Sequence, residues 1–174
     1  MPGLNRDFFL ADAVTVARLL PGMAIVMADG GSTTRYMIRE TEAYLGTGDR
    51  ACHASKGRTR RTEVMYMQGG HLYVYFVYGM HWMMNVVTGP ADDPQAVLIR
   101  AAGEFTGPGR VTKGTGLDGS FNAEDIVSSG RIWIEDRGLR PHVTSGPRVG
   151  IDYAGEPWIS KPWRFMMTEQ TKMI

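Results

Sequence analysis

The sequence holds a single cysteine, Cys52, among its 174 residues. An internal disulfide, a cysteine-rich zinc site and an iron–sulfur cluster all need more thiols, so each is excluded. No apolar run approaches the roughly 20 residues that a membrane-spanning helix needs. The first residues also lack the basic segment and apolar core of a secretion signal. We therefore expect a cytoplasmic protein without membrane contact.

An excess of charge of either sign is missing too, because 19 basic and 18 acidic side chains leave a net charge of +1. The whole protein is thus no polycation, and attraction to nucleic acid would have to come from a local cluster. Hydrophobic residues make up 43% of the chain and charged residues 21%, which is an ordinary globular balance. No linker, repeat or low-complexity tract interrupts the chain, so we predict a single domain over residues 1–174.

Motifs that would fix an activity by themselves are also absent. The chain contains no Walker loop, dinucleotide fingerprint or nucleophile elbow. His53, His71 and His81 share no ligand spacing such as His-x-x-x-His, so a metal centre is not expected.

Hydrophobic periodicity predicts more strands than helices. A helix is expected over residues 7–20, with Asp12 as a cap and Pro21-Gly22 as its end, and a short helix over 122–128, capped by Asn122. Residues 46–70 and 103–119 are expected to be irregular, and 107–110 to form a flexible loop. The pattern favours an α+β fold with a mostly antiparallel sheet. Strands are predicted at 23–27, 36–44, 71–78, 81–87, 96–101, 131–135, 143–149 and 163–167, with Gly79-Met80 between the third and the fourth.

Residues 40–100 concentrate the side chains that could carry chemistry. On a strand, Glu40, Glu42 and Tyr44 share one face, while the aromatic ribbon at 71–80 places Tyr73 and Tyr75 together. Residues 50–61, here called the basic loop, carry five cations and no acid. A solvated loop and a pair of ordinary surface carboxylates would explain these features separately. Together, an aromatic face, a cationic loop and a carboxylate suit hydrolysis at a nucleotide.

Several motifs in the right order resemble the alkyladenine (3-methyladenine) DNA glycosylases. They are residues 40–46 (ETEAYLG), His53, the ribbon 73–80 (YVYFVYGM), Asn85 and Arg100, followed by 107–110 (GPGR), 119–122 (GSFN), 148–150 (RVG), 153–155 (YAG) and 161–165 (KPWRF). The resemblance implies a compact α+β domain without metal or cofactor, with flanking helices, a curved sheet and a protruding hairpin that inserts into DNA. It also implies a monomer that binds double-stranded DNA.

The resemblance further implies an activity and a set of roles. Alkylated or deaminated purines would be flipped out of duplex DNA, and their N-glycosidic bonds cleaved by water to leave an abasic site. Glu42 would activate the water, with Arg100 near it. Tyr44, His53, Tyr75 and Asn85 would line the base pocket, Asn85 discouraging guanine. Tyr78 would wedge into the minor groove, and further DNA contacts are predicted for Met65, Arg58, Arg60, Arg61, Arg110 and Lys113.

Two departures from the family pattern stand out. The segment after Arg100 is shorter than usual, because residues 101–106 lead directly to the Gly-Pro-Gly loop. The basic loop has Thr59-Arg60-Arg61 where the family has Thr-Pro-Arg, so a stiffening proline is lost. Two other functions stay open: a non-catalytic module that binds damaged nucleic acid, and a hydrolase of free nucleosides.

Overall fold

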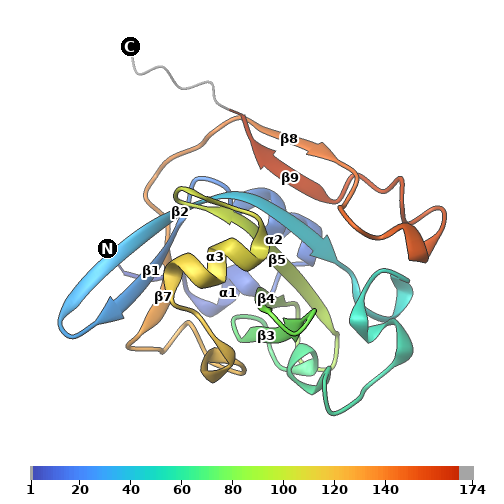
Figure 1. Cartoon of the computed structure of the whole chain (residues 1–174), viewed down its shortest axis with the longest axis horizontal. Helices are drawn as coiled ribbons and strands as arrows, with labels where there is room; N and C mark the ends of the chain where they lie inside the picture. The colour runs from blue at the N-terminus through green and yellow to red at the C-terminus, as the bar shows by residue number, and fades with distance from the viewer. Residues whose placement is uncertain (1, 169–174) are drawn as a thin grey trace.

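A computed structural model describes residues 2–168 (Figure 1). Its strands form one curved sheet in the order β3-β4-β5-β2-β1-β7, with β6 beside β5, β9 beside β2 and β8 beside β9. Every one of these pairings is antiparallel, which confirms the predicted fold class. The strands are β1 Ala24–Asp29, β2 Ser32–Tyr44, β3 Leu72–Val77, β4 His81–Thr88, β5 Gln95–Ala102, β6 Phe105–Thr106, β7 Ile132–Glu135, β8 Val143–Gly146 and β9 Arg164–Met167.

Strand β2 is the spine of the sheet. Its first half pairs with β1, and its second half lies between β5 and β9. The register with β5 shifts on both sides of Glu40, which marks a bulge where β2 changes partners. Glu42, just past the bulge, lies opposite Leu98 on β5 and Arg164 on β9. The residue of greatest interest therefore sits in the middle of the sheet.

Side-chain alternation separates the core from a second, more polar face. Leu72 and Val74 on β3, Met84 and Val86 on β4, and Val97 and Ile99 on β5 belong to the main core. Helix α2 covers this side, where the Thr41 hydroxyl donates to the Ala17 carbonyl at 2.6 Å. The residues between these core positions point the other way. The helices are α1 Arg6–Phe9, α2 Ala13–Leu19 and α3 Pro108–Thr115.

The structure divides the predicted first helix and contains a further helix in a segment predicted to be irregular. Helices α1 and α2 replace one helix over 7–20, and Asp12 caps α2 by accepting from the Thr15 N–H at 3.0 Å. Residues 103–119 are not irregular, since they contain β6 and α3, with Pro108 at the start of α3. Proline suits this place because its fixed φ fits a helix and its missing N–H is not needed there.

The predicted helix over 122–128 is wrong. Ala123 has φ 68°, which an α-helix cannot contain, and Asp125 forms a β-bridge with His71. The Asn122 side chain does not cap a helix; it accepts from the Val74 N–H at 3.0 Å. The predicted strand over 143–149 also ends early, at Gly146, because Pro147 has no N–H to donate to a neighbouring strand.

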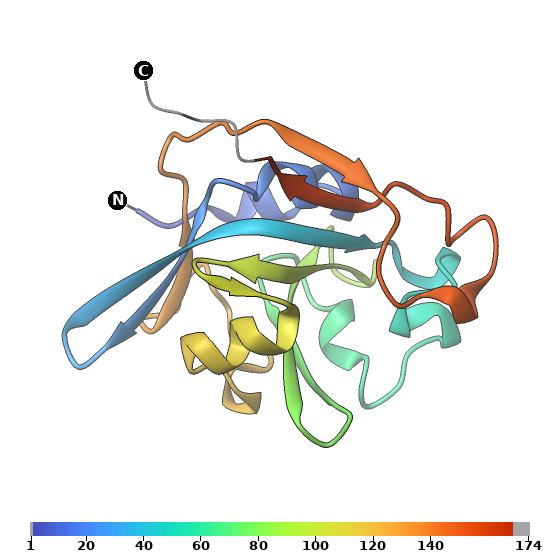
Figure 2. The same cartoon turned by 45° about the horizontal axis from the view of Figure 1, so that its top comes forward.

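Loops and one hairpin surround the polar face. The segment 46–70 carries three short 3-10 helices, Gly46–Gly48, His53–Lys56 and Glu63–Tyr66. Two further ones lie at Gly119–Phe121 and Asp152–Ala154. Hairpin β3–β4 projects from the body of the molecule (Figure 2). Among residues 2–168 no helix is both long and apolar enough to cross a bilayer.

Candidate active site

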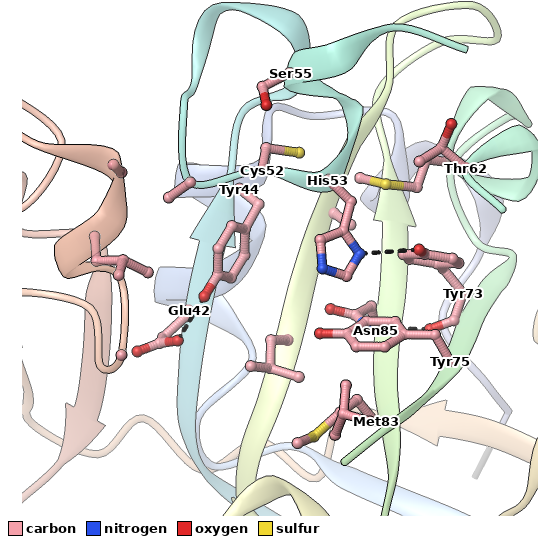
Figure 3. A pocket seen from close by; sticks show the side chains of 18 of the residues that line it. Glu42, Tyr44, Cys52, His53, Ser55, Thr62, Tyr73, Tyr75, Met83 and Asn85 are labelled. Atoms are coloured by element: carbon pink, nitrogen blue, oxygen red, sulfur yellow. Dashed lines mark hydrogen bonds between the residues drawn. The ribbon is translucent and has the colours of Figure 1, made fainter. Parts of the chain in front are cut away.

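The polar face of the sheet is the floor of an open cavity of about 1170 Å³. Its walls come from β2 to β5, from the basic loop and from residues 149–154. Figure 3 shows Glu42 and Tyr44 on one side, and Tyr73, Tyr75 and Asn85 on the other. The structure thus brings together residues as far apart in the chain as Glu42 and Ala154. A concave site with a few polar groups among aromatic rings is typical of a binding site for a small ring system.

Glu42 lies fully buried at the base of this cavity and has donors at both oxygens. The Tyr44 hydroxyl donates to its Oε1 at 2.9 Å, and the Val149 N–H donates to its Oε2 at 2.7 Å. Arg100 Nη1 lies 3.7 Å from Oε1. Because a carboxylate offers about four lone-pair sites, two hydrogen bonds leave capacity for another donor.

Burial and neighbours act in opposite directions on Glu42. Burial raises the pKa of its carboxyl above the ordinary value, while Arg100, the Val149 N–H, Tyr44 and Arg148 pull that pKa down. The net effect is a raised pKa, so the Glu42 carboxylate, once ionised, is a stronger base than an exposed carboxylate. Burial, helped by the Glu42 charge, raises the pKa of Tyr44 well above its usual value, so its hydroxyl stays protonated and can donate.

Glu40 holds Arg100 and does not itself line the cavity. Arg100 Nε donates to Glu40 Oε1 at 2.9 Å, and Arg164 Nη1 reaches the same oxygen at 3.3 Å. The two glutamates therefore share one arginine, as expected for two positions on the same strand face. Their surroundings differ, because the Glu40 side chain is 16% exposed and that of Glu42 is not exposed.

Three rings build the wall that faces Glu42. His53 and Tyr75 meet at 4.6 Å between centroids, and Tyr73 lies 5.1 Å from Tyr75. The His53 Nδ1 is 3.0 Å from the Tyr73 hydroxyl. Burial, with a smaller effect from Arg61, lowers the pKa of His53 to about 4, so this ring is neutral at pH 7. Of these three, Tyr73 was not predicted as a site residue. Its position two residues before Tyr75 on β3 places both rings on one strand face, and this pattern would have predicted it.

Asn85 is buried on β4 and lines the cavity. Its Nδ2 donates to the Tyr73 carbonyl at 3.1 Å, which fixes the amide (Figure 3). A fixed side chain at this depth can limit the shape of what enters.

Tyr78 is the most exposed of the large apolar side chains, at 88%, and lines the rim of the cavity. It sits at the tip of hairpin β3–β4, where the Met80 N–H bonds the Val77 carbonyl at 3.1 Å. Tyr78 and Gly79 have φ values of 54° and 64°, the pattern of a type I′ turn. A tyrosine in this left-handed conformation is strained by about 1–3 kcal/mol, which is a feature of functional positions.

The basic loop is fixed by side chains, although it lacks the family's proline. Thr59 and Thr62 bond each other, the Thr59 N–H donating to Thr62 Oγ1 at 2.9 Å. Arg58 contacts Glu63 at 2.7 Å and Asp92 at 3.1 Å. Arg60 and Arg61 are exposed, and Arg61 also lines the cavity with its guanidinium 5.3 Å from the Tyr75 ring. The three arginines therefore differ in their partners: Arg58 is paired with two acids, whereas Arg61 lies against the cavity.

The remaining residues predicted to contact DNA also differ in exposure. Arg110 and Lys113 are exposed on α3, whose first residue, Pro108, lines the cavity. Met65 is only 2% exposed and packs with Cys52, Ala54 and Tyr73. Such a side chain forms part of the cavity wall, so any contact of Met65 with DNA would be made inside the cavity and not on the exposed surface.

Comparison with known proteins identifies the family of this chain. A sequence model described as "Methylpurine-DNA glycosylase (MPG)" matches residues 7–106 and 103–171. The chain belongs to the methylpurine-DNA glycosylase family. It is therefore an enzyme of the DNA glycosylase type, a hydrolase of N-glycosidic bonds. The two matched pieces overlap at 103–106, within the segment that follows Arg100.

Relatives in the family match along nearly the whole chain. Proteins from Borrelia garinii, Methanocella arvoryzae and Anaeromyxobacter dehalogenans are 41%, 40% and 44% identical to it. The alignments cover 95%, 95% and 94% of this chain and 96%, 92% and 83% of the respective relatives. Each relative carries the name "Putative 3-methyladenine DNA glycosylase".

Proposed function

We propose that this glycosylase removes alkylated purines, 3-methyladenine among them, from duplex DNA with a water molecule activated by Glu42. The names of its relatives support the substrate. The observation that carries the proposal is the position of Glu42. A buried carboxylate with two fixed hydrogen bonds and spare acceptor capacity faces an aromatic slot across the cavity.

Glu42 takes a proton from the water as that water attacks the anomeric carbon of the flipped nucleotide. Alkylation at a ring nitrogen places positive charge on the purine, so the base departs neutral and needs little help from an acid. The sugar then develops oxocarbenium character, which the Glu42 carboxylate also stabilises. Arg100, held by Glu40, favours the ionised form of Glu42 and lies beside the reacting groups.

Tyr44, His53 and Tyr75 hold the flipped base. Aromatic faces attract cations through the ring quadrupole, by about 0.5–2 kcal/mol, so a methylated purine gains more from this slot than a neutral one. The low pKa of His53 supports this selectivity, because an uncharged ring does not repel a cationic base. Asn85 restricts the shape of the pocket and disfavours guanine through its exocyclic amine.

Tyr78 takes the place of the flipped nucleotide in the stack. Its exposed ring at the tip of a tight hairpin, next to the cavity rim, has the shape of such a wedge. Arg60, Arg61, Arg110 and Lys113 contact the DNA phosphates around the cavity. Each is an exposed cation, and phosphate contacts of this kind supply affinity without sequence preference.

Release of free base from methylated duplex DNA tests the proposal. DNA treated with dimethyl sulfate is incubated with excess enzyme; free methylpurines are separated by chromatography, and abasic sites are cut by alkali. We expect 3-methyladenine and an equal yield of abasic sites. Binding without abasic sites would instead mean a damage-binding module. Cleavage of free methylated nucleosides that undamaged duplex does not inhibit would mean a nucleoside hydrolase.

A further inference from the structure

An ion pair without exposed atoms lies directly behind the candidate site. Arg148 Nη1 is 2.6 Å from Asp49 Oδ2, and Arg148 Nη2 is 3.0 Å from Asp49 Oδ1. Neither side chain is exposed to solvent, and neither lines the cavity. A buried ion pair of this kind is weak support for stability, because desolvation of both charges offsets their attraction. Its presence beside the site therefore suggests another role.

The pair ties the end of β2 to the segment 147–151. Arg148 Nη1 also donates to the Ala43 carbonyl at 3.0 Å. Asp49 accepts from the Leu45 and Ala51 N–H groups at 3.1 and 3.0 Å. Figure 2 shows the segment that follows β8 lying beside the 3-10 helices that follow β2. These contacts fix two stretches that are about 100 residues apart in sequence.

Both donors to Glu42 are adjacent to Arg148. Val149, whose N–H reaches Glu42 Oε2, is the next residue in the chain. Tyr44, whose hydroxyl reaches Glu42 Oε1, has its ring 4.8 Å from the Arg148 guanidinium. Trp163 lies 4.9 Å from the same guanidinium. If Arg148 moved, both hydrogen bonds of Glu42 would move with it.

We propose that Asp49 and Arg148 are positioning residues for Glu42. They hold the Val149 N–H and the Tyr44 hydroxyl against its two oxygens, which turns the remaining lone pairs of Glu42 towards the bound water. This inference rests on the proposed role of Glu42 as the base. It assigns to Asp49 and Arg148 an effect on the reaction and not only on folding.

The charges around Glu42 set the sign of the expected pH effect. Arg100 approaches from β5, Tyr44 lies on β2, Arg148 and the Val149 N–H approach from the segment 147–151, and Arg164 on β9 contacts Glu40. Arg148 lowers the pKa of Glu42, so loss of its charge and of the Val149 contact raises that pKa further. A base must be ionised, so the acidic limb of the rate profile moves to higher pH.

The test compares Asp49→Asn/Arg148→Gln with wild type in single-turnover release of 3-methyladenine from methylated duplex between pH 5 and 9. Changing both residues avoids leaving one buried charge unpaired. We expect the plateau rate to fall by about 10- to 100-fold, as small misplacements of catalytic groups do, and the acidic limb to move upward. Arg148→Lys should lower the plateau but keep the limb near that of wild type, because lysine keeps the charge and loses the two-pronged contact.

Arg35→Gln/Glu135→Gln is the matched control, since it removes another ion pair, 2.9 Å long, that lies outside the cavity. It should lower the melting temperature while leaving the rate profile unchanged. A folded Asp49→Asn/Arg148→Gln protein with the wild-type plateau and limb would overturn the inference. If that protein does not fold, a wild-type plateau for Arg148→Lys would overturn it equally. Failure of the proposed function would look different, because Glu42→Gln would then keep the wild-type rate.

Discussion

Replacement of Glu42 by glutamine removes its charge while leaving its shape and hydrogen bonds in place. The amide oxygen can accept from the Val149 N–H, as Oε2 now does at 2.7 Å. The amide nitrogen can donate to the Tyr44 hydroxyl, which is able to reverse its direction. Glu42→Ala, by contrast, would leave the Val149 N–H and the Tyr44 hydroxyl without this partner. Glutamine is therefore the informative substitution.

The stability of Glu42→Gln should be close to that of wild type near pH 7. Because burial raises the pKa of Glu42 above that of the unfolded chain, ionisation costs the folded state free energy once the pH rises through this pKa. The contribution of Glu42 to the free energy of unfolding is thus fully present only below the pKa that Glu42 has in the unfolded chain. Glutamine removes that cost, and this offsets the weaker hydrogen bonds of a neutral side chain.

Activity should fall far more than stability. General-base catalysis is typically worth about 10²–10⁴-fold, which corresponds to about 2.7–5.4 kcal/mol at 1.36 kcal/mol per tenfold. Single-turnover release of 3-methyladenine under saturating enzyme measures the chemical step, and the affinity for lesion-bearing duplex should be unchanged. The wild-type rate should fall as the pH drops through the raised pKa of Glu42, whereas the mutant profile should lack this limb.

Glu40→Gln is the control on the same strand face. The substitution weakens the hydrogen bond that holds Arg100, but Glu40 does not line the cavity. Glu40→Gln should therefore lower the excision rate far less than Glu42→Gln. An inactive Glu40→Gln beside a Glu42→Gln within a few-fold of wild type would show that the wrong carboxylate was assigned. If both variants stay active, the water is activated in another way.

Three further results are expected. Tyr78→Ser should weaken binding to flipped states by about 1–3 kcal/mol and affect plain duplex less; equal fluorescence gain from 2-aminopurine beside the lesion in both proteins would refute the wedge. Asn85→Ser should raise the rate on guanine lesions relative to adenine lesions, and a fixed ratio would make Asn85 structural. Arg60→Gln/Arg61→Gln should reduce the slope of log affinity against log salt by up to about 1.8, at about 0.9 per phosphate. Arg58 is already paired with Glu63 and Asp92, so Arg58→Gln should change this slope little. A larger change for Arg58→Gln than for Arg60→Gln/Arg61→Gln would contradict the assignment of Arg60 and Arg61 as the phosphate contacts.

Local pattern alone determined much of the fold. Alternation along β3 separates Leu72 and Val74 in the core from Tyr73 and Tyr75 in the cavity, as the period of two requires. Individual strands and turns can be predicted from sequence because their backbone conformation depends mainly on residues that are close in the chain. The motifs from 40 to 165 likewise pointed to the family that the comparisons confirm.

Some local predictions failed because distant contacts decided the backbone. The Asn122 side chain bonds the Val74 N–H on β3, and the chain at 122–128 therefore turns and bridges to His71 instead of forming a helix. Met65, for which a DNA contact is predicted, is only 2% exposed and packs with Cys52 and Tyr73 in the cavity wall. Neither outcome can be seen from residues next to these positions.

The chemical setting of Glu42 was decided only by the tertiary structure. Sequence placed Glu40 and Glu42 on one strand face, which made them look alike. Folding brings the Val149 N–H, 107 residues away, onto Glu42 alone, and sets Arg148 and Asp49 behind it. A backbone N–H is the same in every sequence except at proline, so no residue pattern could reveal this contact. The two carboxylates differ because long-range packing buries one and leaves the other to hold an arginine.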